Sequence, residues 1–225
     1  GRSGFGLMAT GVARDLDNEA LGGILNKNAF SLAADGWVSL DKKKNWVVGG
    51  WAGATRVEGS VEQILRLQTS SMHYFQRPDA THVEVDPTAT SLGGWAGRIN
   101  LAKQNGNLLM LASVGAISPG FDPNDVGFQY GASDIVNMQF LPGYQWTKPG
   151  KIFRYALVLG GWFRNYDFEG NKIWDGGLAE FQGQLRNFWM FDVMFAYNPE
   201  TISKNQTRGG PLALMPSGYQ WNLTV

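Results

Sequence analysis

The chain has no cysteine, only two histidines, and equal numbers of basic and acidic residues. Without cysteine, a disulfide scaffold, a thiol nucleophile and a thiolate metal site are all excluded. The largest basic cluster is the lysine run at 42–44, so no surface for nucleic acid is expected. No stretch approaches the roughly 20 apolar residues of a membrane-spanning helix. A helical membrane protein is therefore not expected.

Glycine and aromatic residues are plentiful instead, with 30 Gly, 9 Trp, 7 Tyr and 13 Phe. This composition suits short strands, tight turns and many half-exposed rings, and it indicates an all-β protein. The 225 residues are 44% hydrophobic, which is enough for one substantial domain. No linker or change of composition divides them, so residues 1–225 are expected to form a single β region.

Apolar and polar residues alternate in about ten segments, several of them joined by short turns such as "DKKKN" and "QNGN". This pattern predicts an antiparallel up-and-down meander. Three stretches show the clearest apolar face at alternate positions, namely Phe30–Leu40, Phe153–Phe163 and Trp189–Tyr197. Aromatic residues lie at the ends of these stripes, and about ten tilted residues span about 25 Å, the height of a lipid-facing band.

Two fold classes fit this alternation, a soluble β-sandwich and a transmembrane β-barrel. The barrel is favoured because the face opposite the apolar stripes mixes small, amide, charged and aromatic residues, which suits a lumen better than bulk solvent. The candidate lumen or ligand residues on that face are Asp35, Trp37, Arg154, Trp162, Arg164, Glu180, Gln182 and Gln184.

Two long connections interrupt the strands. Residues 59–88 open with Ser60 and Gln63 at capping-box spacing, which predicts a helical turn or two at the start of a structured loop. Residues 118–131 form an acidic loop rich in proline and glycine, whose aspartates fit Asx-turns. We expect both loops at the extracellular mouth of a barrel, where they would form a lid. The lid candidates are Tyr74, Phe75, Asp79, Phe121, Asp122, Asn124 and Asp125.

The acidic loop has two further interpretations. Oxygen atoms of Asp122, Asn124 and Asp125 suit calcium, although a calcium site normally takes six or more oxygens, so no metal is assigned. The loop could also recognise a ligand or constrict the lumen.

No arrangement of residues indicates catalysis. The two histidines, His73 and His82, lie in a long loop without a serine or carboxylate pattern typical of a triad. The acidic residues on strands, such as Asp35 and Glu180, are scattered. We therefore expect no catalytic residue, no enzyme activity and no cofactor.

Three segments resemble a known family: "YFQRPDATHVEVDPTATSLGG", "SPGFDPNDVGFQYGASD" and "TRGGPLALMPSGY". They are similar, in the same order, to the C-terminal region of a family of large outer-membrane β-barrel proteins of Gram-negative bacteria, whose function is unknown. In that family the barrel commonly follows a carbohydrate-binding-like domain, and some members bear the label membrane-associated hydrolase. The resemblance implies an outer-membrane location and supplies no catalytic residues.

The favoured function is an outer-membrane barrel that admits or binds a small solute, with saccharides as candidate ligands and entry limited by the extracellular loops. Such a barrel has the lipid bilayer as its partner, and no nucleic acid. The other functions are a scaffold barrel in an assembly with other envelope proteins and a barrel-embedded hydrolase. The chain is expected to be a piece of a larger barrel with more strands.

Overall fold

The computed structural model describes residues 1–129, 131 and 133–225. The helices are α1 (Glu19–Gly22) and α2 (Val61–Thr69). The strands are β1 (Ser3–Ala13), β2 (Asn28–Ser39), β3 (Trp46–Glu58), β4 (Ser91–Lys103), β5 (Leu108–Ile117), β6 (Ile135–Trp146), β7 (Phe153–Tyr166), β8 (Lys172–Leu185), β9 (Met190–Asn198), β10 (Thr201–Ser203), β11 (Ala213–Met215) and β12 (Gly218–Thr224).

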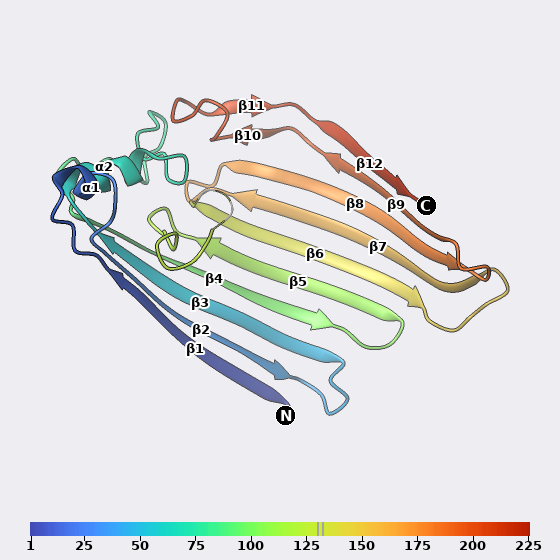
Figure 1. Cartoon of the computed structure of the whole chain (residues 1–225). Helices are drawn as coiled ribbons and strands as arrows, with labels where there is room; N and C mark the ends of the chain where they lie inside the picture. The colour runs from blue at the N-terminus through green and yellow to red at the C-terminus, as the bar shows by residue number, and fades with distance from the viewer. Residues whose placement is uncertain (130, 132) are drawn as a thin grey trace.

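Ten strands form one antiparallel sheet in the order of the chain, from β1 to β9, with β12 paired to β9. Strands β10 and β11 form a separate small sheet. Figure 1 shows the large sheet as a curved, open surface with β1 and β12 at its two edges. The prediction of an all-β antiparallel meander of about ten strands is confirmed. The sheet does not close on itself, because β1 and β12 do not pair with each other.

The two ends of this sheet differ in their connections. At one end, which we call the turn end, the strands are joined by residues 40–45, 104–107, 147–152 and 186–189. At the opposite end, the loop end, four long connections comprise residues 14–27, 59–90, 118–134 and 199–217, the last of which contains β10 and β11. Figure 1 shows both chain termini at the turn end. The loop end therefore holds most of the chain that lies outside the strands.

The register gives the sheet two distinct faces, because directly paired residues of antiparallel strands point to the same side. Asp35 pairs with Trp51, and Trp51 pairs with Arg98. We call this side the inner face, because a loop lies on it: the Asp122 amide donates to Oγ1 of Thr55, which shares the side of Trp51, at 3.0 Å. The other side is the outer face.

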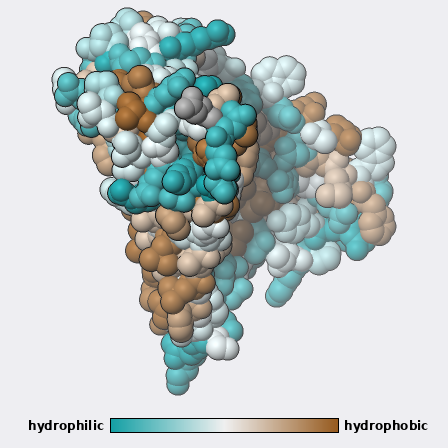
Figure 2. Space-filling model, turned by 60° about the vertical axis from the view of Figure 1, so that its left-hand side comes forward, coloured by the Kyte–Doolittle hydropathy of each residue, from teal (hydrophilic) through white to brown (hydrophobic). Residues whose placement is uncertain are grey.

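The outer face exposes large apolar side chains. On β2, Phe30 and Leu32 are 50% and 63% exposed, and on β9 Phe195 is 49% exposed. Figure 2 shows a hydrophobic band on the strands below a hydrophilic loop end. For the stretches Phe30–Leu40 and Trp189–Tyr197, the predicted apolar stripe therefore lies on one face, and that face is the outer one.

Strand β7 has the opposite phase from the prediction. Leu157 pairs with Gln182 and Leu159 with Glu180, so the stripe from Leu157 to Phe163 lies on the inner face, and Val158 points outward. The middle of this strand is apolar at both sets of positions, so its pattern does not distinguish the faces. A β-bulge between Phe153 and Tyr155 also shifts the register.

The connection after β3 begins with α2, as its capping residues predict. The Ser60 hydroxyl accepts a hydrogen bond from the Gln63 amide at 3.2 Å. Ile64 of this helix packs with Val57 and Leu92, which lie on the inner face of β3 and β4. The helix thus covers the inner face at the loop end. Neither described helix is long and apolar enough to cross a membrane.

Candidate functional site

The inner face carries a row of polar side chains across the middle of the sheet. Asp35 pairs with Trp51, and Trp51 pairs with Arg98. Arg98 pairs with Gly115 of β5, which pairs in turn with Asn137 of β6. Asn137 pairs with Asn165 of β7. These residues come from six strands and converge because alternate positions of each strand share one face. Part of the row lines a hollow of about 300 Å³, with Arg98 and Trp51 among its walls.

Arg98 lies at the centre of this row and is fixed by neutral partners. Its Nη2 donates to the Ser113 hydroxyl at 2.6 Å, its Nη1 to Asn137 Oδ1 at 3.1 Å and its Nε to Asn100 Oδ1 at 3.1 Å. The Asn137 amide in turn donates to Asn165 Oδ1 at 2.6 Å. The guanidinium is therefore oriented by a network that spans four strands.

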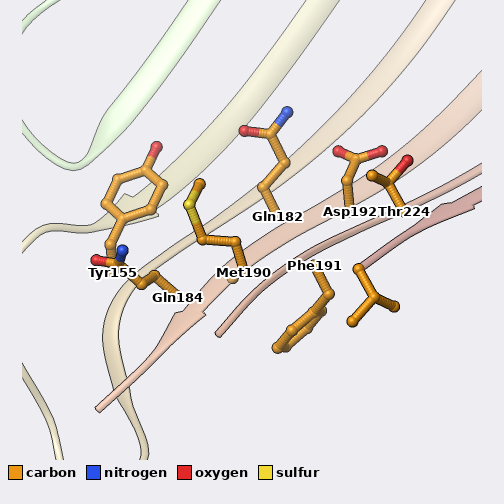
Figure 3. Close-up of a pocket in the computed structure, with 9 residues that line it drawn as sticks. Tyr155, Gln182, Gln184, Met190, Phe191, Asp192 and Thr224 are labelled. Carbon is orange, nitrogen blue, oxygen red and sulfur yellow. The ribbon is translucent and has the colours of Figure 1, made fainter. Parts of the chain in front are cut away.

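A second hollow lies at the turn end, near the edge formed by β9 and β12 (Figure 3). It measures about 390 Å³, and Gln182 and Asp192, which pair in the register, both contribute to its lining. Figure 3 shows Gln182, Asp192 and Thr224 pointing to one side of the sheet and Phe191 to the other. Gln182 also donates to Glu180 at 2.5 Å. Most of the lining of this second hollow is apolar, and Gln182 and Asp192 are among the few residues that contribute polar groups to it.

The structure separates the predicted lumen residues into two sets. The residues on the inner face are Asp35, Trp37, Glu180, Gln182 and Gln184. The remaining three are not in this set. Trp162 and Arg164 point outward from β7, where Arg164 pairs with Asp175 at 2.8 Å. Arg154 lies at the bulge of β7, and its guanidinium carbon lies 4.2 Å from the ring centre of Phe188. The prediction that Trp162 and Arg164 share a face with Asp35 is therefore wrong, and the register does not assign Arg154 to either face.

Two long connections pack together at the loop end. We call residues 59–90 and 118–134 the cap, of which positions 130 and 132 lie outside the described residues, including position 130 of the predicted acidic loop. His73 joins the two segments: its Nδ1 lies 2.7 Å from the Pro119 carbonyl oxygen and its Nε2 lies 3.3 Å from Asp122 Oδ2. The Ser133 amide donates to the Met72 carbonyl at 2.9 Å. Segments far apart in the sequence thus form one unit on the inner face.

The lid candidates take part in this packing in different ways. Tyr74 is buried, and Phe75 packs against the apolar core around Ile64. Asp79 accepts a hydrogen bond from the amide of Leu212, which belongs to the connection before β12. The aromatic residues of the lid therefore fill the interior of the cap, and Asp79 ties the cap to a further segment.

Asp122 is the most strongly constrained residue of the acidic loop. Burial alone would raise the pKa of its carboxyl group, but hydrogen bonds from His73 and Asn124 outweigh burial and hold the pKa below its ordinary value. Asp125 forms an ion pair with Arg14 at 2.7 Å and accepts a hydrogen bond from Asn26. The oxygens considered for calcium are thus engaged by protein groups.

A cluster of charged side chains is buried where the cap meets its neighbours. We call it the Asp134 cluster, and it comprises Arg77, His82, Asp134, Asp167 and Lys204. The Asp134 carboxylate lies 2.9 Å from His82 Nε2, 3.2 Å from Lys204 Nζ and 3.6 Å from Arg77 Nη2. Burial lowers the pKa of Lys204, although the charge of Asp134 opposes this effect. Opposite charges therefore hold four segments of the loop end together.

The sequence did not indicate several of these residues. His73 and His82 are not isolated loop histidines, since each contacts a carboxylate from a distant segment. Arg98 and Asn100 are two residues apart in a largely apolar strand. This spacing could have predicted that one face of the strand is polar. Among the described residues, no group of three or more His, Asp or Glu side chains is arranged to hold a metal ion.

Comparison with known proteins gives one match. The family model described as "Domain of unknown function (DUF5916)" matches residues 57–211, which is more than half of the chain. The match covers both segments of the cap, Arg98 and most of the large sheet. No curated protein and no solved structure matches the chain. The chain belongs to the DUF5916 family of proteins.

Proposed function

We propose that the large sheet is part of the wall of an outer-membrane β-barrel, which admits or binds a polar solute along its inner face. The observation that carries this proposal is the apolar outer face. Large apolar side chains are exposed there on strand after strand, including Trp95, Val193 and Trp221. In a soluble sandwich such a face would pack against a second sheet, whereas in a membrane it contacts lipid.

Charges on the outer face support the same interpretation, because they lie near the strand ends. At the loop end Arg56 pairs with Glu58 at 2.8 Å, and Arg164 pairs with Asp175 at 2.8 Å. Lys103 lies at the turn end of β4. An apolar band between polar ends is the pattern expected of a lipid-facing wall.

Aromatic residues on the outer face gather toward both ends of that band. Tyr144 and Trp146 lie at the turn end of β6 with ring centres 4.7 Å apart, and Tyr197 and Tyr219 lie toward the loop end with ring centres 5.1 Å apart. Aromatic girdles of this kind flank the lipid-facing band of outer-membrane barrels.

The inner face suits a polar ligand, and saccharides are the class that we favour. Trp37 and Trp51 are about 40% exposed, at 41% and 43%, and share this face with the amides around Arg98. Exposed rings beside amides and charges can stack on a sugar and hydrogen-bond its hydroxyl groups. The cap lies over the same face at the loop end, where it would limit entry.

Among the described residues, the two edge strands of the sheet are unpaired on one side, which bears on the size of the proposed barrel. Strands β1 and β12 each pair on one side only in the described chain. An open edge within lipid leaves backbone amides and carbonyls without partners, at a cost of several kcal/mol for each group. We therefore propose that further strands pair with β1 and β12 and complete a larger barrel.

A scaffold role is the second candidate, favoured by one observation. Helix α2, Phe75 and the acidic loop fill the inner face at the loop end, so the interior could be closed to solutes. In that case the cap would be a plug, and the barrel would contribute to an assembly with other envelope proteins.

A direct test of the wall places single cysteines at chosen positions, since these 225 residues contain none. Val193→Cys and Gln182→Cys, which lie on opposite faces of paired strands, are labelled with a fluorophore in full-length protein reconstituted into lipid vesicles. We expect a lipid-borne quencher to reach the label at 193, and a water-soluble quencher to reach the label at 182. Quenching of both labels from water would overturn the membrane proposal.

Entry is tested with the same vesicles. Deleting residues 120–126 removes the part of the acidic loop that lies on the inner face, so solute-driven vesicle swelling should become faster while the barrel stays folded. An unchanged swelling rate with an intact barrel would favour the scaffold role.

A further inference from the structure

Arg98 differs from most of the arginines that the structure fixes in place. Arg66 and Arg186 also donate to neutral oxygens, but both are exposed and lie outside the strands. Arg14, Arg56, Arg77 and Arg164 each lie within 4.0 Å of a carboxylate. The described residues place no carboxylate within that distance of Arg98, whose partners are a hydroxyl and two amide oxygens. Among the described residues, the positive charge of Arg98 is therefore not part of an ion pair.

We propose that Arg98 binds the anionic group, a carboxylate or a phosphate, of the solute that the inner face receives. This inference rests on the proposed function, since it assumes that solute reaches the inner face. A guanidinium offers more N–H groups than the three partners of Arg98 use, and it matches the oxygens of a carboxylate or phosphate. Arg98 also lines the hollow of about 300 Å³, so these groups are accessible.

The neighbouring strand is built to hold Arg98 flat against the sheet. Gly115 pairs with Arg98, and a Cβ atom at position 115 would lie 2.9 Å from the Gly97 carbonyl oxygen and 3.2 Å from both Cβ and Cγ of the arginine. Glycine leaves the space that lets the side chain cross β5 and reach Asn137 on β6. Asn137 is itself oriented by Asn165. The guanidinium is thus preorganised, which lowers the entropic cost of binding an anion.

Trp51 indicates the chemical class of the remainder of the solute. It pairs with Arg98 in the register, lines the same hollow and exposes 43% of its surface. An aromatic ring beside a free cation suits a sugar ring that carries one anionic substituent. Three acidic residues lie on the strands of the inner face. Glu180 and Asp192 lie on the distant strands β8 and β9, and Asp35 lies on β2, where it pairs with Trp51 and is two strands away from Arg98.

The test compares three probes that share one sugar ring. Binding of glucose, glucuronate and glucose 6-phosphate to full-length protein is measured by tryptophan fluorescence at constant ionic strength. We expect at least one anionic probe to bind roughly tenfold or more tightly than glucose, the increment of a charge-assisted hydrogen bond. Which anion binds more tightly distinguishes carboxylate from phosphate recognition.

Variants assign the preference to Arg98. Arg98→Gln should abolish the difference between the anions and glucose, and Arg56→Gln on the outer face should preserve it. Gly115→Ala keeps the guanidinium but crowds both its stem and the Gly97 carbonyl beside it, and it should weaken anion binding several-fold even if Arg98→Gln fails to fold. Binding of the three probes with equal affinity, binding of none of them, or a preference retained in Arg98→Gln would overturn the inference. A failed membrane proposal would show itself separately, in the quenching of the label at position 193.

Discussion

The two faces of the large sheet follow different rules, although the same strands build both. The outer face exposes large apolar residues such as Phe30 and Phe195 and keeps its charges near the strand ends. The inner face carries charge at its centre, in Arg98, and is covered by the cap at one end. A residue's tolerance to substitution should therefore depend on its face more than on its strand.

The largest expected effect comes from placing a charge on the outer face. Val193→Arg should lower the free energy of unfolding by about 2–4 kcal/mol if the site lies near the bilayer midplane. Gln182→Arg, on the inner side of the paired strand, should change it by less than about 1 kcal/mol because it remains in a polar region. Urea unfolding of full-length protein in vesicles measures both variants, and equal costs would mean that the two faces do not differ.

Strand β7 gives a second test of the difference between the two faces, because the residues predicted to face outward lie on the inner face. Val158 lies on the outer face and Leu157 on the inner face, where it is buried. Val158→Arg should therefore lower the free energy of unfolding by as much as Val193→Arg does. The alternation of the sequence alone would instead place Leu157 in contact with lipid. If a lipid-borne quencher reached a label at position 157 and not one at position 158, Leu157 would be the residue that faces lipid.

A smaller difference between the two faces is expected at two adjacent glycines of β4. At Gly94, a Cβ atom would collide with the backbone amide of Phe121 in the acidic loop. At Gly93, on the outer face, the nearest atom would be the Thr55 carbonyl oxygen at 3.4 Å, an ordinary contact. Gly94→Ala should destabilise the packing of the cap by about 1–3 kcal/mol, as overpacking does, and Gly93→Ala should have little effect.

Hydrogen exchange of residues 118–128 measures this difference. We expect faster exchange in Gly94→Ala, together with faster vesicle swelling, and wild-type behaviour in Gly93→Ala. If both variants exchange as slowly as wild type, the acidic loop does not depend on its contact with the inner face.

The smallest effect is a loosening of the cap at low pH. The pKa of Asp122 is lower in the folded protein than its ordinary value, so its contribution to stability is present above that ordinary value, about 3.9, and is lost as the pH falls through the folded pKa. Hydrogen exchange of residues 118–128 should therefore accelerate below about pH 4. The change should be modest, because Ser133 and Thr55 also hold the loop.

Asp122→Asn provides the control for this titration. The variant should exchange faster than wild type at neutral pH and show a weaker dependence on acid over the same range. An identical acid response in both proteins would show that Asp122 is not its source.

Sequence patterns predicted the parts of the fold that depend on local signals. The capping residues placed the start of α2, and β2 could be read because only one of its two sets of positions is uniformly apolar. In β7 both sets are apolar at the centre, and its arginines lie near the ends, so alternation alone could not assign the faces. The bulge after Phe153 has no local signal comparable to a cap.

The candidate site was less predictable, because its contacts join distant segments. Gln182 and Glu180 were found from the alternation of β8. Arg98 requires Asn137 from a strand two places away, and His73 requires Asp122 from another loop. Such pairs depend on the order of strands in the sheet and on the path of the long loops, which neither composition nor periodicity specifies.

The Asp134 cluster has a consequence for how the molecule is assembled. A single carboxylate receives groups from three other segments: His82 of the first cap segment, the amide of Phe168 between β7 and β8, and Lys204 after β10. The lysine is separated from Asp134 by 70 residues and directly follows β10. Contacts at such separation form late when a chain folds, because the intervening loop must close first. We therefore expect β1–β9 to pair before Lys204 reaches Asp134, so that a partly folded chain has a formed sheet whose loop end is not yet held together.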